Sequence, residues 1–210
     1  EALIGSLGHT AVANGTLAVV QAAQKNNALG GAATGSFGTS SHAEDCIYVG
    51  DLYVTMYRVN QIGKGQMPSV SRLFQFNPMP TGPDERPIRS RPSVAYNDSN
   101  NGLWVYYGTG RYETAADKVN AAQQYFLGLK DGVVPRSSPY ALSDLAALEA
   151  RFVTATVGGT TRLARTISGS NAANTPWALK LYAGQAGWGG PSLTGGSERV
   201  FTKPLVVGGI

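Results

Sequence analysis

Cysteine, charged residues and long apolar runs are all scarce in this chain of 210 residues. The single cysteine, Cys46, excludes an internal disulfide framework, a zinc site with two thiolates from one chain and a CxxC redox motif. No apolar run approaches the roughly 18 residues that a transmembrane helix needs, so no membrane span is predicted. The net charge of +4 is spread along the chain without a Lys/Arg cluster, which argues against nucleic acid as a partner.

Catalytic signatures are also missing. The sequence has no GxSxG motif, no HExxH motif and no recognisable pair of carboxylates, so we expect no enzymatic activity. It opens at Glu1 with neither an initiator Met nor a signal sequence, which predicts a processed piece or an excised domain. The length allows one large domain or two small ones, and we interpret residues 1–210 as a single domain.

Glycine, proline and aromatic residues are what the chain has in quantity. Its 27 Gly and 11 Pro, with ten Tyr and three Trp, predict an all-β fold of short strands and many turns. The clearest hairpin is Cys46 to Val59, hinged at Gly50-Asp51. A second hairpin runs from Pro92 to Gly108 around the turn NDSNNG, and a further strand runs from Gln123 into the Asp131-Gly132 turn.

The remaining segments are predicted from weaker patterns. Asn14-Gly15 predicts a hairpin over residues 11–20, and the small residues 21–41 predict a loop. Residues 60–91 read as an exposed connection that contains one short strand, SRLFQF.

The second long insertion, residues 132–175, contains the single expected helix. Ser143 and Asp144 suit a helix start, and Leu145, Leu148 and Phe152 follow at helical spacing, so a helix over Ser143 to Phe152 is predicted. Two further strands, Trp177 to Tyr182 and Arg199 to Gly209, complete a count of roughly eight or nine, mostly in antiparallel hairpins.

Five segments, in this order, resemble one family. They are IYVGDLYVTMYRV, PIRSRPSVA, WVYYGTGRYE, QQYFLGLKDG and SERVFTKPLVVGG, which together cover most of residues 45–209. This series is similar to the C-terminal domain of the PilY1/PilC type IV pilus tip proteins. The resemblance implies a modified β-propeller, and it assigns residues 1–44 only weakly. Because a blade takes about 40 to 50 residues, this chain would supply only three to four blades of an incomplete propeller.

The resemblance also implies a calcium loop directly before IYVGDL. Asp45 matches the last carboxylate of that loop, and it is the candidate metal ligand. The preceding residues, GTSSHAE, supply few carboxylates, whereas calcium takes six to eight oxygen ligands. We therefore predict no cofactor and no calcium binding here, with Asp45 kept as the residue to test.

Other suggestive residues have structural interpretations. His42 and Cys46 are only two soft ligands, so no zinc site is expected, although Cys46 could pair with a cysteine in a missing segment or in another chain. Gly108 to Arg111 lacks the features of a phosphate loop and reads as a strand end, and the turn NDSNNG reads as a plain hairpin turn. Trp104 and Trp177 are expected in packing, while Trp188 lies in a Gly-rich loop as either a plug or a binding residue.

The function implied by the resemblance is a non-enzymatic binding and assembly module of type IV pili, extracellular, at the pilus tip or outer cell surface. Its partners would be minor pilins or other tip components, the rest of the same propeller or a completing chain, and a surface receptor. Two alternatives stay open. A quinoprotein-like propeller enzyme is suggested by YVGDL, but the single Cys and few carboxylates count against it, and a generic periplasmic propeller scaffold is the other.

Overall fold

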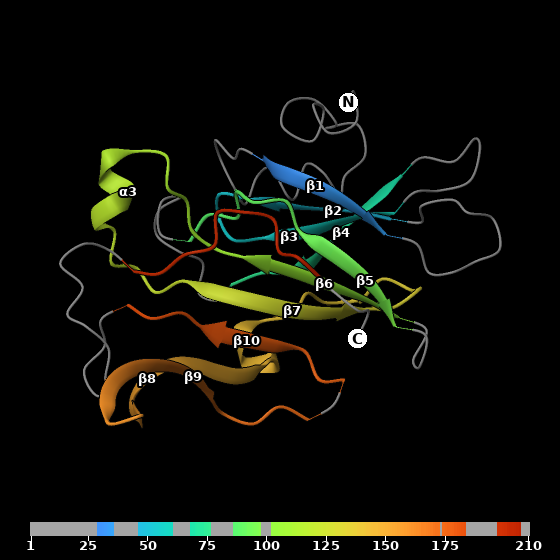
Figure 1. The fold of residues 1–210 in the computed structure, drawn as a ribbon. Coiled ribbons are helices and arrows are strands. Elements are labelled where there is room, and N and C mark those ends of the chain that lie inside the picture. Colours follow the sequence, from blue (N-terminus) through green and yellow to red (C-terminus); the bar gives the residue numbers. More distant parts are fainter. Residues whose placement is uncertain are drawn as a thin grey trace.

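The computed structural model describes ten strands, one α-helix and one 3-10 turn (Figure 1). The description covers residues 29–35, 46–60, 68–76, 86–97, 102–172, 174–183 and 197–206. The predicted hairpin over residues 11–20, and also Asp45, His42 and Trp188, lie outside these residues. The described strands form two sheets, so the expected mostly β architecture with one short helix is confirmed.

The first sheet, called sheet 1, is an antiparallel meander of four strands in chain order. They are β1 (Leu29–Gly35), β2 (Cys46–Asp51), β3 (Met56–Asn60) and β4 (Ser69–Phe74). The prediction of a loop over residues 21–41 is wrong at β1, which is a strand of small residues. The exposed connection expected over residues 60–91 is also wrong in part, because β4 pairs with β3 and buries Leu73 and Phe74.

The β2–β3 hairpin is confirmed, but its turn follows Asp51 instead of centring on Gly50-Asp51. The Asp51 carboxylate accepts backbone hydrogen bonds from Tyr53 and Thr55, both at 2.8 Å, and one from the Tyr57 hydroxyl at 2.8 Å. A short polar side chain that satisfies its own turn in this way fixes the turn geometry. Asp51 is fully buried, so the conspicuous Gly-Asp pair is a structural feature of this hairpin.

The second sheet, called sheet 2, is built on a similar antiparallel unit, in the order β5-β6-β7-β10. These strands are β5 (Ser93–Asn97), β6 (Gly102–Gly108), β7 (Tyr125–Asp131) and β10 (Trp177–Lys180). The predicted β5–β6 hairpin and the predicted strands at Gln123 and Trp177 are confirmed. Residues 197–206, in contrast, form no strand, so the strand expected from Arg199 is wrong over its described part.

A hairpin replaces the predicted helix in sheet 2. Residues Ser143 to Phe152 are not a helix, because β8 (Ala146–Val157) and β9 (Thr160–Ser168) form a β-hairpin, preceded by a 3-10 turn at Leu142–Asp144. Gly158 and Gly159 adopt φ values of +58° and +77°, as a two-residue hairpin turn requires. The Thr- and Val-rich run around this turn outweighs the helical spacing of three apolar residues. β8 runs parallel to β10 and extends the sheet.

The main core lies between the two sheets, and alternate residues of each strand supply it. In β6, Leu103, Val105 and Tyr107 face sheet 1, where they meet Tyr48 and Phe74. The opposite faces are apolar as well. Sheet 1 carries a second cluster there, and sheet 2 carries an aromatic layer. The cluster on sheet 1 comprises Val49, Tyr57, Val59 and Val70, and the aromatic layer on sheet 2 comprises Trp104, Tyr106, Phe126 and Trp177. The packing roles predicted for Trp104 and Trp177 are therefore confirmed.

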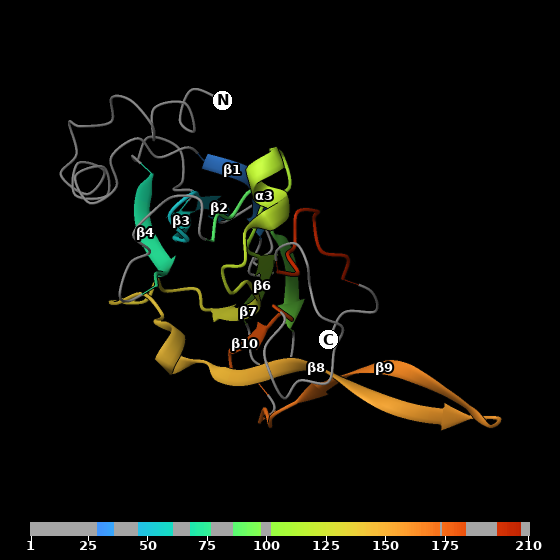
Figure 2. The same cartoon turned by 90° about the vertical axis from the view of Figure 1, so that its left-hand side faces the viewer.

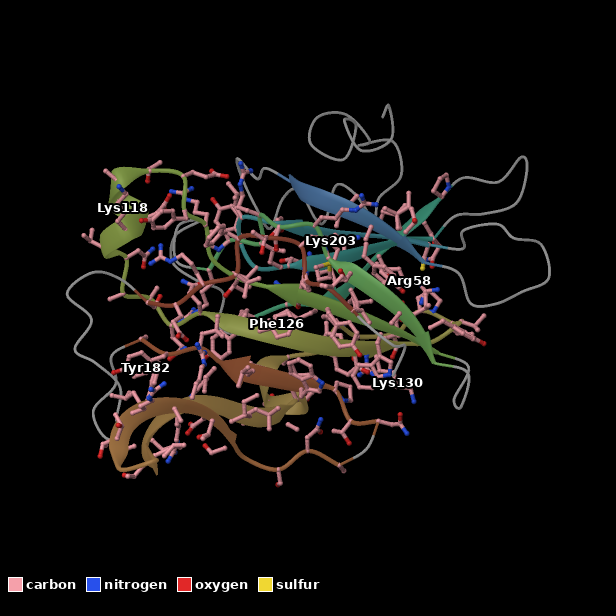
Figure 3. All side chains as sticks on the ribbon, viewed as in Figure 1. Arg58, Lys118, Phe126, Lys130, Tyr182 and Lys203 are labelled. Atoms are coloured by element: carbon pink, nitrogen blue, oxygen red, sulfur yellow. The ribbon has the colours of Figure 1, made fainter. Side chains whose placement is uncertain are left out.

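Buried charges fasten sheet 1 to sheet 2. Arg58 of β3, labelled in Figure 3, lies at this junction. It donates to both carboxylate oxygens of Asp131 at 2.8 and 2.9 Å, and to the carbonyl oxygens of Gly132 and Val133. The Tyr48 hydroxyl donates to the same carboxylate at 2.5 Å. Burial raises the pKa of Asp131, and hydrogen bonds from Tyr48 and Arg58 oppose that rise. Each polar atom of the carboxylate has a partner, which such a buried ion pair requires.

Candidate binding site beside helix α3

Helix α3 (Ala115–Val119) is the short helix of the described chain, and two side chains fix its start. The Thr114 hydroxyl caps its start, and the carboxylate of Asp117 accepts backbone hydrogen bonds from Glu113 and Thr114 at 2.9 and 2.7 Å. Thr-x-x-Asp is a variant of the capping box, a signal that the sequence contains and our prediction missed. The helix therefore lies at residues 115–119 and not in the insertion at 132–175.

Arg111 completes this arrangement. Its guanidinium donates to Asp117 at 2.8 Å, and the Asp117 side chain is almost fully buried. Burial alone would raise the pKa of Asp117, but the hydrogen bonds from Arg111, Glu113 and Thr114 lower it below its ordinary value. Arg111 thus belongs to the support of the helix.

The preceding glycines form a strand end, as expected. The N–H groups of Thr109 and Gly110 donate to the carbonyl oxygens of Tyr125 and Pro87, which leaves neither for a bound anion. Gly110 has a φ of +105°, and a Cβ there would collide with the side chain of Arg199. Position 110 therefore requires glycine, both because its φ is positive and because a side chain would not fit beside Arg199.

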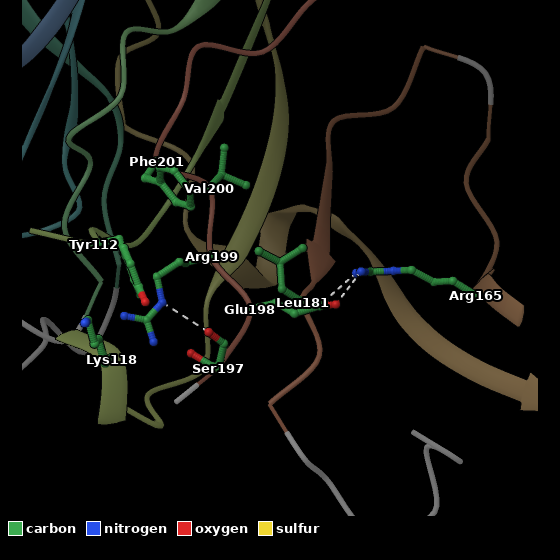
Figure 4. Close-up of a pocket in the computed structure, with 9 residues that line it drawn as sticks. All are labelled: Tyr112, Lys118, Arg165, Leu181, Ser197, Glu198, Arg199, Val200 and Phe201. Carbon is green, nitrogen blue, oxygen red and sulfur yellow. Dashed lines mark hydrogen bonds and ion pairs between the residues drawn. The ribbon is translucent and has the colours of Figure 1, made fainter. Parts of the chain in front are cut away.

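The C-terminal segment, residues 197–206, crosses beside this helix and closes one wall of a pocket. Arg199 donates to the carbonyl oxygens of Arg111, Asp117 and Asn120, which ties the segment to the end of α3. Glu198 pairs with Arg165 of β9 through both carboxylate oxygens. These two side chains place the segment between the helix and the hairpin (Figure 4).

The pocket has a volume of about 520 Å³ and combines an apolar floor with an aromatic wall. Leu181 and Val200 form part of the lining. Tyr112 and Phe201 stack with ring centroids 5.9 Å apart, and they expose 53% and 56% of their surface. Lys118 reaches the rim from α3 (Figure 4). Exposed rings beside a positive rim suit the binding of an extended or anionic ligand.

The lining has contacts suited to binding and no arrangement suited to catalysis. The hydroxyl of Ser197 donates to the Ala122 carbonyl at 2.6 Å, and the described residues include no histidine that could act as its base. Nor do the described residues contain a group of three or more His, Cys, Asp or Glu side chains placed to hold a metal ion.

The residues singled out in the sequence are dispersed. Asp45 lies outside the described residues, so the expectation that no calcium binds at this loop stays a prediction. Cys46 is fully buried, and its thiol lies 3.6 Å from the carbonyl oxygen of Gly35 in the neighbouring strand. The pocket was missed from sequence because its residues come from four separate segments, which only the fold brings together. In the described residues, no helix is long and apolar enough to cross a membrane.

Comparison with solved structures shows what the fold resembles. The crystal structure of the Pseudomonas aeruginosa PilY1 C-terminal domain matches with a TM-score of 0.54 at 19% sequence identity. The match covers 73% of this chain and 39% of that one, so the chain spans well under half the length of the solved domain. No family model matches the sequence, and no curated protein matches it. The resemblance predicted from five segments is thereby confirmed at the level of fold: the chain is similar to part of the PilY1 C-terminal domain.

Proposed function

We propose that this chain is a non-enzymatic binding and assembly module of a type IV pilus, and that it forms part of a β-propeller. The observation that carries the proposal is its fold likeness to the PilY1 C-terminal domain, which agrees with the five sequence segments. That domain gives the type IV pilus context. The module would act by presenting surfaces to partners, since the pocket beside α3 is equipped for binding.

The sheets support the propeller part of the proposal. A propeller blade is a four-stranded antiparallel sheet, and both β1-β2-β3-β4 and β5-β6-β7-β10 have that form. Blades pack face to face around an axis, with their first strands innermost. The first strands β1 and β5 do lie against each other, since Gly31 approaches Arg91 and Gly35 approaches Val94.

The outer faces of the two sheets give further support. An isolated two-sheet protein would keep these faces polar, whereas here both bear apolar or aromatic clusters. A strand of a sheet that is covered on both faces reads as a near-continuous apolar run, as β6 does. We infer that further blades, from the same protein or from a completing chain, belong beside these sheets.

The location and partners follow from the same proposal. A pilus module of this kind would be exported through the periplasm and displayed at the pilus tip or outer cell surface. There it would contact minor pilins or other tip components, and it would contribute to adhesion through a surface receptor. The pocket beside α3 and the insertion at 132–175 are the surfaces best placed for such contacts.

The proposal is tested in the host by deleting the gene that encodes this chain. We expect fewer surface pili in sheared fractions and weaker attachment to surfaces, both restored by the wild-type gene. A matched complementation with Arg58→Met, which disrupts the junction of the sheets, should fail to restore them. Normal piliation and attachment in the deletion strain would contradict the pilus role. Quinone absorbance in the purified protein would instead favour the enzyme alternative.

A further inference from the structure

The β8–β9 hairpin leaves the body of the molecule as an arm. Figure 2 shows it projecting beyond the other strands. Its base is anchored, because Ala150 is fully buried, Phe152 packs edge-on against Tyr182 at 4.9 Å and Arg165 pairs with Glu198. Further out the side chains are exposed on both faces. The large apolar ones are Val153, Val157 and Leu163, with exposed fractions of 42%, 71% and 53%, and Ile167, opposite Ala150 at the base, is 62% exposed.

Neighbouring blades do not account for this exposure. The proposed propeller axis lies on the side where β5 meets β1, and the arm occupies the opposite edge of sheet 2. Strands added around the axis would cover the faces of the sheets and leave the far edge open. An isolated two-stranded hairpin is at best marginally stable in water, so an arm of this length is suited to a partner that covers it.

The outer strand β9 is an open sheet edge. Among the described residues it pairs with β8 alone, over nine residue pairs in an unbroken register. Edge strands are usually protected by Pro, charged side chains, a bulge or short length. β9, TTRLARTIS, is nine residues long, has no Pro and shows no bulge in its register, so its only protection is the charge of Arg162 and Arg165, which an acidic partner would neutralise. Its outward N–H and C=O groups are therefore available to an added strand.

Charge specifies the occupant. From Ala150 to Ser168 the arm carries three arginines, at positions 151, 162 and 165, and no carboxylate. Arg151 pairs with Glu149 at the base of the arm and Arg165 pairs with Glu198, so Arg162 is the cation that is left for a partner. A second copy pairing antiparallel along the same edge would bring Arg162 and Arg165 of each chain near those of the other, and like charges across a strand pair are destabilising. A strand with acidic side chains carries the opposite charge, so it is the partner that this edge favours.

We propose that β9 is a docking edge, to which an extended segment of a partner protein with alternating apolar and acidic side chains adds as a further strand. Main-chain hydrogen bonds along the edge supply the affinity, and Arg162 selects for acidic side chains. This inference concerns the arm and does not depend on the pilus role. It goes beyond the proposed function by naming a contact surface and the chemistry of its partner.

The test uses the full chain and two nine-residue peptides, one alternating Val and Glu and the other alternating Val and Lys. Hydrogen exchange of individual amides reports where each peptide binds. We expect the Glu peptide to slow exchange at alternate residues of β9, and the Lys peptide to leave them unchanged. Arg162→Glu should weaken binding of the Glu peptide about three- to tenfold, as reversal of one cross-strand charge pair implies. Lys203→Glu, an equal charge change at an exposed position outside both the arm and the pocket lining, should not.

Three outcomes would overturn the proposal. Equal protection by the Lys peptide would remove the charge argument, and protection confined to other strands would remove β9 as the edge. Protection of the arm by phosphatidylglycerol vesicles, with none by the Glu peptide, would assign the arm to an anionic membrane surface. Unchanged exchange rates in β6 and β7 of Arg162→Glu verify that the variant is folded.

Discussion

Strands β6 and β9 belong to the same sheet and differ in nearly everything else. β6 is buried at all seven positions, with aliphatic and aromatic side chains on both faces. β9 is buried at none, and most of its residues are Thr, Ser or Arg, with Leu163, Ala164 and Ile167 among them. The first strand lies between two packed layers, whereas the second forms the rim of an arm. The same backbone pattern thus serves as a core and as an exposed edge, depending on which side chains it carries.

The contrast between β6 and β9 also shows where sheet 2 accommodates an insertion. Residues 132–176 separate β7 from β10, yet Trp177 to Lys180 pair with Gly128 to Tyr125 as adjacent strands of a meander would. Sheet 1 has the same four-stranded form without an insertion. The four-stranded unit is therefore common to both sheets, and the insertion is added at its outer side without altering the pairing.

The largest effect is expected at the buried junction between the sheets. Arg58→Met should lower the free energy of unfolding by about 3–5 kcal/mol, because it leaves the Asp131 carboxylate buried without its charge partner. Arg151→Met in the arm should change it by less than about 0.5 kcal/mol, since that arginine is exposed. Urea denaturation measures both, and comparable losses would contradict the contrast between core and arm.

A smaller effect should appear at α3, with a defined pH dependence. Because the folded pKa of Asp117 lies below its ordinary value, the ionised carboxylate stabilises the fold. This contribution is complete above about pH 4 and declines as the pH falls below that value. Asp117→Asn should cost about 1.5–3 kcal/mol at neutral pH and flatten the acid limb of the stability curve. Asp144→Asn, at an exposed turn, is the control, and an unaltered acid limb in Asp117→Asn would contradict the assignment.

The close packing of sheet 2 predicts a comparable penalty for one added methyl group. A Cβ at Gly128 would lie 2.5 Å from the Trp177 ring, so Gly128→Ala should cost about 1–3 kcal/mol. At Gly132 the nearest atom would be 3.7 Å away, and Gly132→Ala should be neutral within about 0.5 kcal/mol. Thermal unfolding of the pair compares them directly. If both variants are neutral, Trp177 is not held against Gly128.

Shortening the arm should have the smallest effect of the structural changes. Deleting residues 154–157 and 160–163 joins Val153 and Ala164, which are paired, through Gly158-Gly159. The residues removed lie in the exposed part of the arm, so stability should change by less than about 0.5 kcal/mol. A loss above about 1 kcal/mol would mean that the distal arm packs against the body.

Calcium should affect neither region. The loop before Ile47 is poor in carboxylates, so calorimetric titration is expected to detect no binding tighter than millimolar. Asp45→Ala should therefore behave as the wild type does. A micromolar site that disappears in Asp45→Ala would instead make Asp45 a ligand, with backbone carbonyls or another chain supplying the other oxygens.

Local patterns predicted those parts of the fold that local physics determines. The β2–β3 and β5–β6 hairpins and β7 combine alternating apolar residues with turn residues, and all three were predicted. The helix at Ser143 was wrong because three residues at helical spacing weigh less than a Gly-Gly turn between β-branched runs. β1 has no strand signal of its own. Its small residues are there because Gly31 and Gly35 approach β5 and β6 closely, a long-range constraint that a local window cannot contain.

The candidate site was less accessible to prediction. Tyr112, Lys118 and Phe201 have no shared motif, and they meet only because Arg199 binds carbonyl groups at the end of α3. Thr114 and Asp117 did signal a helix start, but a five-residue helix has no apolar periodicity to support that signal. Sequence segments identified the resembling fold, whereas the surface had to come from the structure.

The position of the hairpin also bears on the order in which the sheet can assemble. Joining β10 to β7 closes a loop of residues 132–176, and closure entropy rises with loop length. The β8–β9 hairpin is local, and once formed it brings Ala146 and Ser168 to the same end, which roughly halves the free loop and lowers the closure cost by about 0.6 kcal/mol. β8 then offers a ready parallel edge to β10. The hairpin inside the insertion thereby lowers the entropy cost of pairing β10 with β7.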